Sequence, residues 1–147
     1  MKETEEQMPD RLGKLSHIGI AVSDLEEAKR LYSEVLGFTL TAEKEMPERG
    51  LKVAFLETGN TRIELLEGTT PESNITRFIE KRGAGIHHLS FEVDGIRRII
   101  KELAEEGVQL IDKEPRAGAE GHLTAFMHPK STMGVLLAVS YTHLRAH

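Results

Sequence analysis

The stretch that decides the fold runs from residue 85 to residue 94 and reads GIHHLSFEVD. From His88 onward, polar and apolar residues alternate, which is typical of a β-strand with one face on a hydrophobic core. His88 lies on the polar face together with Ser90 and Glu92. The alternation therefore predicts a strand that carries a histidine toward the side around which the sheet curves.

A near copy of this stretch occurs at residues 17–22, which read HIGIAV. His17 and Gly19 share one face of this second strand, and branched aliphatic residues share the other. Two strands in one register, each opening with a histidine on its polar face, indicate an internal duplication. We expect the two histidines to belong to one metal site.

The rest of the chain repeats in the same order. Each histidine-bearing strand precedes a helix that ends at a glycine, Gly37 in the first half and Gly107 in the second. Three strands follow, predicted at 38–44, 51–57 and 61–66, and again at 108–112, 122–128 and 135–139. A strand–helix–strand–strand–strand unit cannot close its own sheet, so two units must pair. The sequence predicts an α+β fold of two tandem βαβββ modules, whose eight strands form a curved, partly closed mixed sheet around a metal cleft.

The predicted domain spans residues 14–137, with one module over 14–82 and the other over 83–137. Residues 1–13 are predicted to be a flexible leader. Residues 1–10 are polar and mostly acidic and contain no apolar h-region, so they are not a secretory signal.

The composition excludes several classes of protein. A net charge of −5 disfavours binding to nucleic acid through a basic patch. The absence of cysteine excludes disulfides and thiolate metal sites, which leaves His, Asp, Glu, Gln or water as metal ligands. No apolar run approaches the roughly 20 residues that a membrane-spanning helix needs. We expect a cytoplasmic protein that neither binds nucleic acid nor enters a membrane.

Repeat symmetry places the remaining metal ligands on the last strand of each half. In the first half, Glu64 stands between Ile63 and Leu65, so its carboxylate lies on the opposite face. Such a carboxylate is costly to bury unless it is paired or coordinated. Alone, Glu64 fits an exposed strand residue; beside two symmetric histidines it fits a ligand. The predicted set is His17, Glu64 and His88, which suits a divalent first-row metal with open positions for water or substrate.

Other polar residues carry less weight. His87, at the start of its strand, is expected to be structural or to contact a metal ligand. The Gly-rich loop at residues 114–121 offers backbone N–H groups, and the turn at residues 128–131 offers Lys130 and Ser131. Both suit an anion, with a plain loop and a solvent-exposed turn as the alternatives.

Several motifs together resemble the vicinal oxygen chelate superfamily of paired βαβββ modules and, within it, the methylmalonyl-CoA epimerase family. They lie at residues 17–22, 36–38, 61–67, 85–93, 110–116 and 126–131, and include paired histidines, Glu-Pro-Arg and His-Pro-Lys-Ser. The resemblance covers about residues 14–137, and the joint occurrence of the motifs makes it specific.

The resemblance implies interconversion of the two epimers of methylmalonyl-CoA, a small-molecule acyl-CoA substrate. It also implies a divalent metal ion (cobalt, manganese or zinc) held by His17, Glu64 and His88. A metal that grips the thioester and carboxylate oxygens would stabilise the enolate formed when the α-proton leaves, and inversion needs an acid/base group on each face. We expect a homodimer. The candidates for substrate binding are Arg116, Lys130 and Ser131.

The sequence departs from the family at the fourth ligand. A Glu should follow Leu137, but the chain has Ala138, which cannot bind a metal. That Glu is also a candidate proton-transfer group, so the catalytic residue here is unknown. A second acid/base carboxylate of some members aligns near Val53, which is not ionisable. The resemblance stops at Leu137, so residues 138–147 are expected to be a foreign or frame-shifted tail, with a divergent natural tail as the alternative. We expect weak metal binding and slow or no turnover.

Two other functions fit the same pattern. A glyoxalase-like lyase or a ring-cleaving dioxygenase of this fold would use a similar metal set. A non-catalytic resistance or sequestration protein would hold a small molecule without chemistry, and Ala138 favours that class somewhat.

Overall fold

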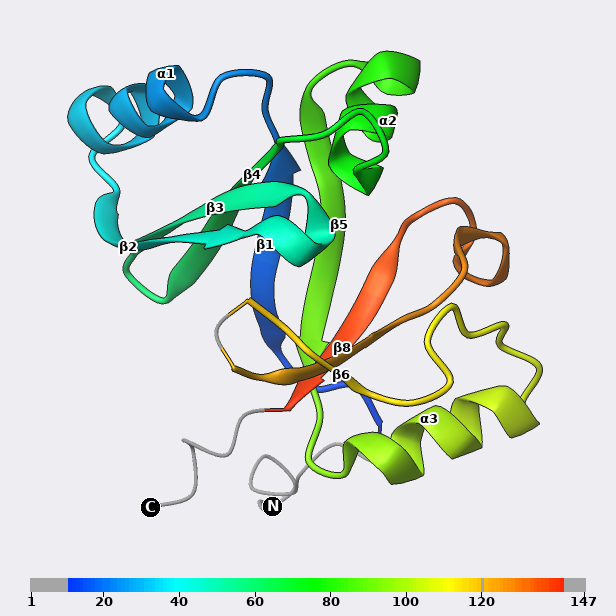
Figure 1. Cartoon of the computed structure of the whole chain (residues 1–147). Helices are drawn as coiled ribbons and strands as arrows, with labels where there is room; N and C mark the ends of the chain where they lie inside the picture. Colours follow the sequence, from blue (N-terminus) through cyan, green and yellow to red (C-terminus); the bar gives the residue numbers. More distant parts are fainter. Residues whose placement is uncertain (1–10, 120, 142–147) are drawn as a thin grey trace. The chain divides into compact units, whose positions relative to one another are not determined.

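A computed structural model gives the structure of the chain and describes residues 11–119 and 121–141. The strands are β1 (Leu15–Ala21), β2 (Thr39–Met46), β3 (Leu51–Thr58), β4 (Thr61–Gly68), β5 (Gly85–Glu92), β6 (Arg116–Ala117), β7 (Leu123–Phe126) and β8 (Leu137–Tyr141) (Figure 1). The helices are α1 (Leu25–Arg30), α2 (Asn74–Arg82) and α3 (Ile96–Glu105), with a π-helical turn η2 (Leu31–Val35) and the 3-10 turns η3 (Pro47–Arg49) and η4 (Pro129–Thr132).

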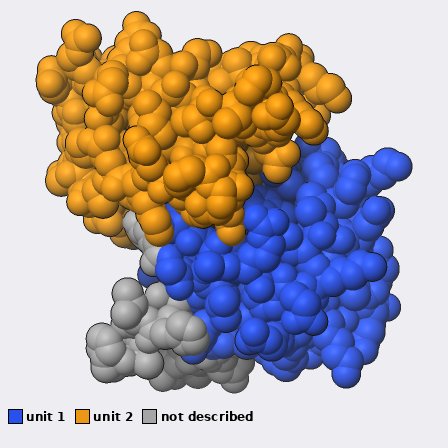
Figure 2. Space-filling view, viewed as in Figure 1, with its two compact units in different colours: residues 1–15, 90–147 blue, residues 16–89 orange. Residues whose placement is uncertain are grey.

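The described residues form two compact units, which Figure 2 shows in different colours. Unit 2 comprises residues 16–89, and unit 1 comprises the described residues on either side of it. β5 belongs to both units, because its first five residues lie in unit 2 and its last three in unit 1. The predicted module boundary between residues 82 and 83 stays a prediction.

The strands of unit 2 follow the order β2-β3-β4-β1-β5. β2, β3 and β4 pair antiparallel, whereas β1 runs parallel to β4. In this register Gly19 of β1 is the partner of Glu64 in β4. His17 stands two residues before Gly19, so it shares a face of β1 with that glycine. The pairing thus brings two of the predicted ligands to neighbouring strands.

The opposite face of these strands builds the core of unit 2. Its buried members are Leu25, Ala54, Leu56, Ile63 and Leu65. α1 begins after Asp24, whose carboxylate accepts the Glu27 N–H at 3.1 Å, and Leu25 joins the core at once. The helix predicted to end at Gly37 runs without a break through α1 and η2 to Val35, but its hydrogen-bond pattern changes from α-helical to π-helical after Arg30. In that stretch the Ser33 hydroxyl donates to the Lys29 carbonyl at 2.6 Å and so competes with the backbone ladder.

The strands of unit 1 follow the order β5-β8-β7-β6. Its core gathers the apolar stripe of α3 and the inner residues of β7 and β8: Val93, Ile96, Ile99, Ile100, Ala125, Met127 and Val139. Leu12 also packs against this core, and the Gly13 N–H donates to the Glu92 carbonyl at 2.7 Å. Leu12 and Gly13 thus contact unit 1, and residues 1–10 lie outside the described part of the chain. The flexible leader stays a prediction.

The strand predicted at 108–112 is wrong. Only Leu110 makes a bridge there, to Met127, and the strand of this region is β6. The cause lies at Asp112, which is buried and whose carboxylate accepts the Phe126 N–H at 2.9 Å. Backbone bonds still join the His128 N–H to the Gln109 carbonyl at 2.8 Å and the Ile111 N–H to the Phe126 carbonyl at 2.9 Å. At the Phe126 N–H, however, a side-chain carboxylate takes the place of a backbone acceptor, so the pairing is irregular.

The last strand extends beyond its predicted end at residue 139. β8 continues through Tyr141, and Ala138, Val139 and Ser140 are buried. The first residues of the predicted tail are therefore part of the sheet, and residues 142–147 lie outside the described part of the chain. The origin of the tail stays a prediction.

The predicted fold class is confirmed. Each half supplies strand–helix–strand–strand–strand, and the eight strands form one mixed sheet in an α+β fold. None of the helices in the described part of the chain has the length and apolar character that a membrane span requires.

Candidate metal centre

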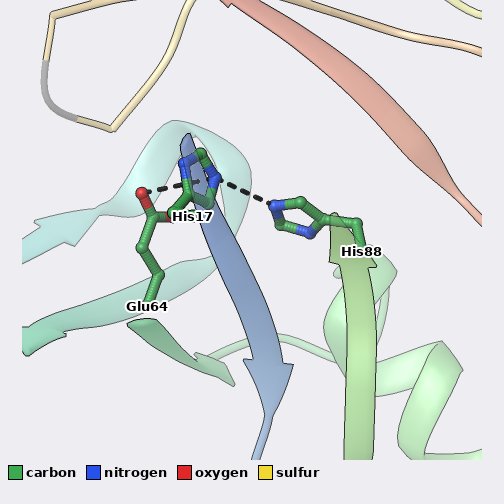
Figure 3. A group of neighbouring side chains, drawn as sticks. All are labelled: His17, Glu64 and His88. Atoms are coloured by element: carbon green, nitrogen blue, oxygen red, sulfur yellow. Dashed lines mark hydrogen bonds and ion pairs between the residues drawn. The ribbon is translucent and has the colours of Figure 1, made fainter. Parts of the chain in front are cut away.

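The three predicted metal ligands meet within unit 2. His17 comes from β1, Glu64 from β4 and His88 from β5 (Figure 3). His17 Nε2 lies 3.3 Å from His88 Nε2 and 3.5 Å from Glu64 Oε2. One ligand atom from each residue lies within 4.8 Å of the others. Residues that are far apart in the sequence thus present two imidazole nitrogens and a carboxylate oxygen to one point.

A glycine makes room for this arrangement. A Cβ atom on Gly19 would lie 2.2 Å from Cε1 and 2.5 Å from Nδ1 of His88. The imidazole of His88 therefore occupies the space that a side chain at position 19 would fill. The strand register places this gap beside Glu64, which is the partner of Gly19.

All three side chains are buried, with relative exposures of 8% for His17, 8% for Glu64 and 6% for His88. Burial in the first place, and then the neighbouring His17 and His87, hold the pKa of His88 well below its usual value. His88 is consequently neutral at physiological pH, which is the form of histidine that binds metals.

Each of the two histidines is also held at its other ring nitrogen. The Ser16 hydroxyl lies 3.2 Å from His17 Nδ1, and His87 Nδ1 lies 3.0 Å from His88 Nδ1. Burial lowers the pKa of His87 to about 4, so its ring is neutral too. His87 thus contacts a predicted ligand, which is one of the two roles expected for it.

These distances fit a metal ion shared by the three donors. Nitrogen and oxygen ligands lie about 2.0–2.2 Å from a zinc-like cation, so two donors on one ion are about 3–3.5 Å apart. The separations of His17 Nε2 from His88 Nε2 (3.3 Å) and from Glu64 Oε2 (3.5 Å) fall in this range. Nitrogen and carboxylate donors also suit first-row divalent metals. The metal-ligand role of the three residues is therefore a proposal that the geometry supports.

The residues predicted to bind substrate all belong to unit 1. Arg116 is half-exposed and lies 3.4 Å from the buried Asp112 carboxylate. Lys130 is exposed in the η4 turn, where its N–H donates to His128 Nδ1 at 3.1 Å. The Ser131 hydroxyl accepts the Gln109 N–H at 2.8 Å. Their role in binding a substrate stays a prediction.

The position of the expected fourth ligand also lies in unit 1. Ala138 is fully buried in β8, where it pairs with Phe126 of β7. A methyl group stands where the family resemblance implies a carboxylate, so the described chain offers three of the four implied ligands.

Known proteins match this chain in sequence and in structure. The family model of the Glyoxalase/Bleomycin resistance protein/Dioxygenase superfamily matches residues 16–126. The chain is 39% identical over 128 residues to mitochondrial methylmalonyl-CoA epimerase of Mus musculus, covering 86% of this chain and 72% of that one. It is 40% identical over 128 residues to ethylmalonyl-CoA/methylmalonyl-CoA epimerase of Cereibacter sphaeroides, covering 86% and 96%. A solved variant of Streptomyces coelicolor methylmalonyl-CoA epimerase, in complex with 2-nitronate-propionyl-CoA, matches with a TM-score of 0.85 at 30% identity, covering 90% and 96%.

The chain belongs to the Glyoxalase/Bleomycin resistance protein/Dioxygenase superfamily. Within that superfamily the relatives and structural neighbours named above are methylmalonyl-CoA epimerases, which are isomerases. The resemblance drawn from the sequence motifs is thereby confirmed.

The sequence did not predict two residues of this centre. Gly19 was assigned to the polar face of its strand, but no pattern indicated that His88 would lie over it. Nor did the pattern indicate a role for Ser16, although a serine directly before a ligand histidine can reach the Nδ1 atom of that histidine and is visible in the sequence.

Proposed function

We propose that this chain epimerises methylmalonyl-CoA with a divalent cation (cobalt, manganese or zinc) held by His17, Glu64 and His88. The observation that carries the proposal is the meeting of these three buried side chains in one cluster. The relatives named methylmalonyl-CoA epimerase supply the substrate and the reaction.

The three residues would divide the work of holding the cation. His17 and His88 would each offer an Nε2 lone pair, and Glu64 would offer a carboxylate oxygen with a negative charge. Their burial keeps competing water away and strengthens the electrostatic attraction. When bound, the cation would supply Lewis-acid chemistry, because it stabilises negative charge on the substrate oxygens as the α-proton leaves.

We further propose that turnover is slow. Inversion needs an acid/base group on each face of the planar intermediate. The position at which the family resemblance implies such a carboxylate holds Ala138, and the second implied position holds Val53, which is fully buried and not ionisable. Arg116, Lys130 and Ser131 would bind the acyl-CoA substrate through its anionic groups.

The test is exchange of the α-proton. The cobalt-loaded protein is incubated with one epimer of methylmalonyl-CoA in deuterated water, and deuterium at the α-carbon is followed by mass spectrometry. Exchange above that of a protein-free sample, lost in Glu64→Ala and kept in Glu64→Gln, supports the proposal. Both variants remove the carboxylate, but only Glu64→Gln keeps a side-chain oxygen that can bind the cation. A difference between the two variants therefore reports the loss of a ligand oxygen.

Other outcomes would point to the alternatives. Tight binding of an acyl-CoA without exchange indicates a binding protein, and oxygen consumption with a catechol indicates a dioxygenase. The homodimer and the cytoplasmic location belong to the same proposal, and light scattering after gel filtration measures the former.

A further inference from the structure

We propose that Ser16 and His87 are positioning residues, each of which holds the Nδ1 atom of the following histidine so that both Nε2 atoms face one cation. The inference rests on the proposed function, because the cation is the one held by His17, Glu64 and His88.

The first argument is that the contact occurs twice. Ser16 Oγ lies 3.2 Å from His17 Nδ1, and His87 Nδ1 lies 3.0 Å from His88 Nδ1. In both strands the partner is the residue directly before the histidine. The two Nε2 atoms then lie 3.3 Å apart. Two strands of the internal repeat therefore orient their imidazoles by the same local device.

The second argument concerns the position of the ring proton. A neutral imidazole that binds a metal through Nε2 must carry its proton on Nδ1, which then needs an acceptor. The Ser16 hydroxyl oxygen can accept that proton from His17, since a hydroxyl has lone pairs as well as a proton. His87 Nδ1 can accept from His88 when the His87 proton is on Nε2.

The third argument is that the ring of His87 is itself fixed. Phe78 of α2 meets the His87 ring edge-on, with ring centroids 4.9 Å apart and an angle of 78°. The guanidinium carbon of Arg82 lies 5.8 Å from the centroid of the same Phe78 ring. A packed ring offers its acceptor in one direction, which is what orientation of His88 requires.

The test compares variants that keep or remove the acceptor. Ser16→Ala and His87→Phe remove it, whereas Ser16→Thr keeps a hydroxyl and His87→Asn keeps an acceptor near the place of Nδ1. Affinity for cobalt(II) is measured by calorimetry against a competing chelator. Loss of such a partner typically weakens metal binding about 10–100-fold. We expect that loss in Ser16→Ala and His87→Phe and much smaller changes in the other two.

A control variant and an independent readout complete the design. Ser33→Ala also removes the hydrogen bond of a serine hydroxyl, which Ser33 of η2 donates to the Lys29 carbonyl of α1, and should leave cobalt affinity unchanged. In the zinc-loaded protein, long-range ¹⁵N–¹H spectra of the imidazoles should show the ring proton of His17 and His88 on Nδ1. This measurement needs no variant, so it stands even where a substitution prevents folding.

The outcomes are distinct. If the parent chain binds cobalt and both Ser16→Ala and His87→Phe bind it equally well, the inference is wrong while the proposed function stands. A zinc-loaded parent with the His88 proton on Nε2 overturns it as well. A parent chain that binds neither metal overturns the proposed function itself, and the inference with it.

Discussion

Gly19 lies directly beneath the imidazole of His88. A Cβ atom at this position would come within 2.2 Å of His88 Cε1, a separation that no real pair of such atoms tolerates. The neighbouring Glu64 lies beside the same glycine in the sheet. Because Gly19 has no Cβ atom, the imidazole of His88 can reach the candidate metal centre from another strand.

Gly19→Ala should push the His88 ring out of place. We expect cobalt affinity to fall by more than tenfold, because one nitrogen donor no longer reaches the cation, while the sheet still forms. Calorimetric titration with cobalt measures the loss, and the melting temperature in chelator reports the fold.

The matched control is Gly95→Ala. Its Cβ would lie 3.6 Å from the nearest atom of Arg98, and its φ of −125° suits any residue. We expect its cobalt affinity to equal that of the parent. Equal cobalt binding by Gly19→Ala would show that His88 does not need the space above Gly19.

Much of this arrangement follows from the sequence, because it depends on two simple regularities. Alternation assigns His17, Glu64 and His88 to the polar faces of their strands, and the repeat relates the two histidines. Neither regularity tells which side chain fills the space above a strand glycine, since that depends on the approach of another strand. Gly19 and His88 could therefore be placed on strands but not against each other.

The prediction from the sequence is wrong where a side chain replaces a backbone group as hydrogen-bond acceptor. The run at residues 108–112 has the composition of a strand, yet the Asp112 carboxylate accepts the Phe126 N–H, and the backbone pairing with residues 126–128 is irregular. Similarly, the helical spacing up to Gly37 does not reveal that the turns after Arg30 widen into a π-helical turn. Such local competition leaves no trace in hydrophobic periodicity.

Asp112 should contribute to stability as well as to the position of Arg116. Its buried carboxylate accepts the Phe126 N–H at 2.9 Å and pairs with Arg116 at 3.4 Å. Asp112→Ala removes this acceptor, so we expect a loss of about 1–3 kcal/mol in the free energy of unfolding. Asp112→Asn keeps an acceptor oxygen and should lose less. Urea unfolding measures both.

Asp94→Ala is the control for this pair, because Asp94 is exposed and its replacement should change the stability by only about 0.5 kcal/mol. If Asp112→Ala is as stable as Asp94→Ala, the contacts of the Asp112 carboxylate with Phe126 and Arg116 do not stabilise the fold.

Ala138→Glu should strengthen metal binding if position 138 is the fourth ligand, as the family resemblance implies. The site is fully buried, so a carboxylate without a partner there destabilises the fold. We expect the variant to melt lower than the parent in chelator and to gain more stability from cobalt, with faster α-proton exchange. Thermal unfolding with and without cobalt measures this gain.

Ala138→Leu adds a side chain of similar bulk without a ligand, so cobalt should stabilise it no more than it stabilises the parent. If Ala138→Glu binds cobalt no better than the parent, the assignment of Ala138 to the ligand position fails.

The metal-free protein should lose stability on acidification. Burial lowers the pKa of His87 to about 4 and also holds that of His88 well below its usual value, whereas both are near 6.5 in the unfolded chain. Below about pH 6.5 the unfolded state therefore binds protons that the folded state does not, and the free energy of unfolding falls as the pH falls. Above pH 6.5 both histidines are neutral in the folded and in the unfolded state, so their titration no longer changes the free energy of unfolding. His87 alone should give a slope on the order of 1 kcal/mol per pH unit between about pH 6 and 4.5.

Urea unfolding in chelator at several pH values from 4.5 to 7.5 gives this slope. Because other groups also titrate in the range, the informative quantity is the difference between the parent and His87→Asn, which cannot take up the proton. We expect the variant to show the shallower dependence, with the two curves parallel above pH 6.5. Parallel curves over the whole range would mean that His87 has the same pKa in the folded protein as in the unfolded chain. Burial of its ring beside Phe78 and His88 would then not lower that pKa.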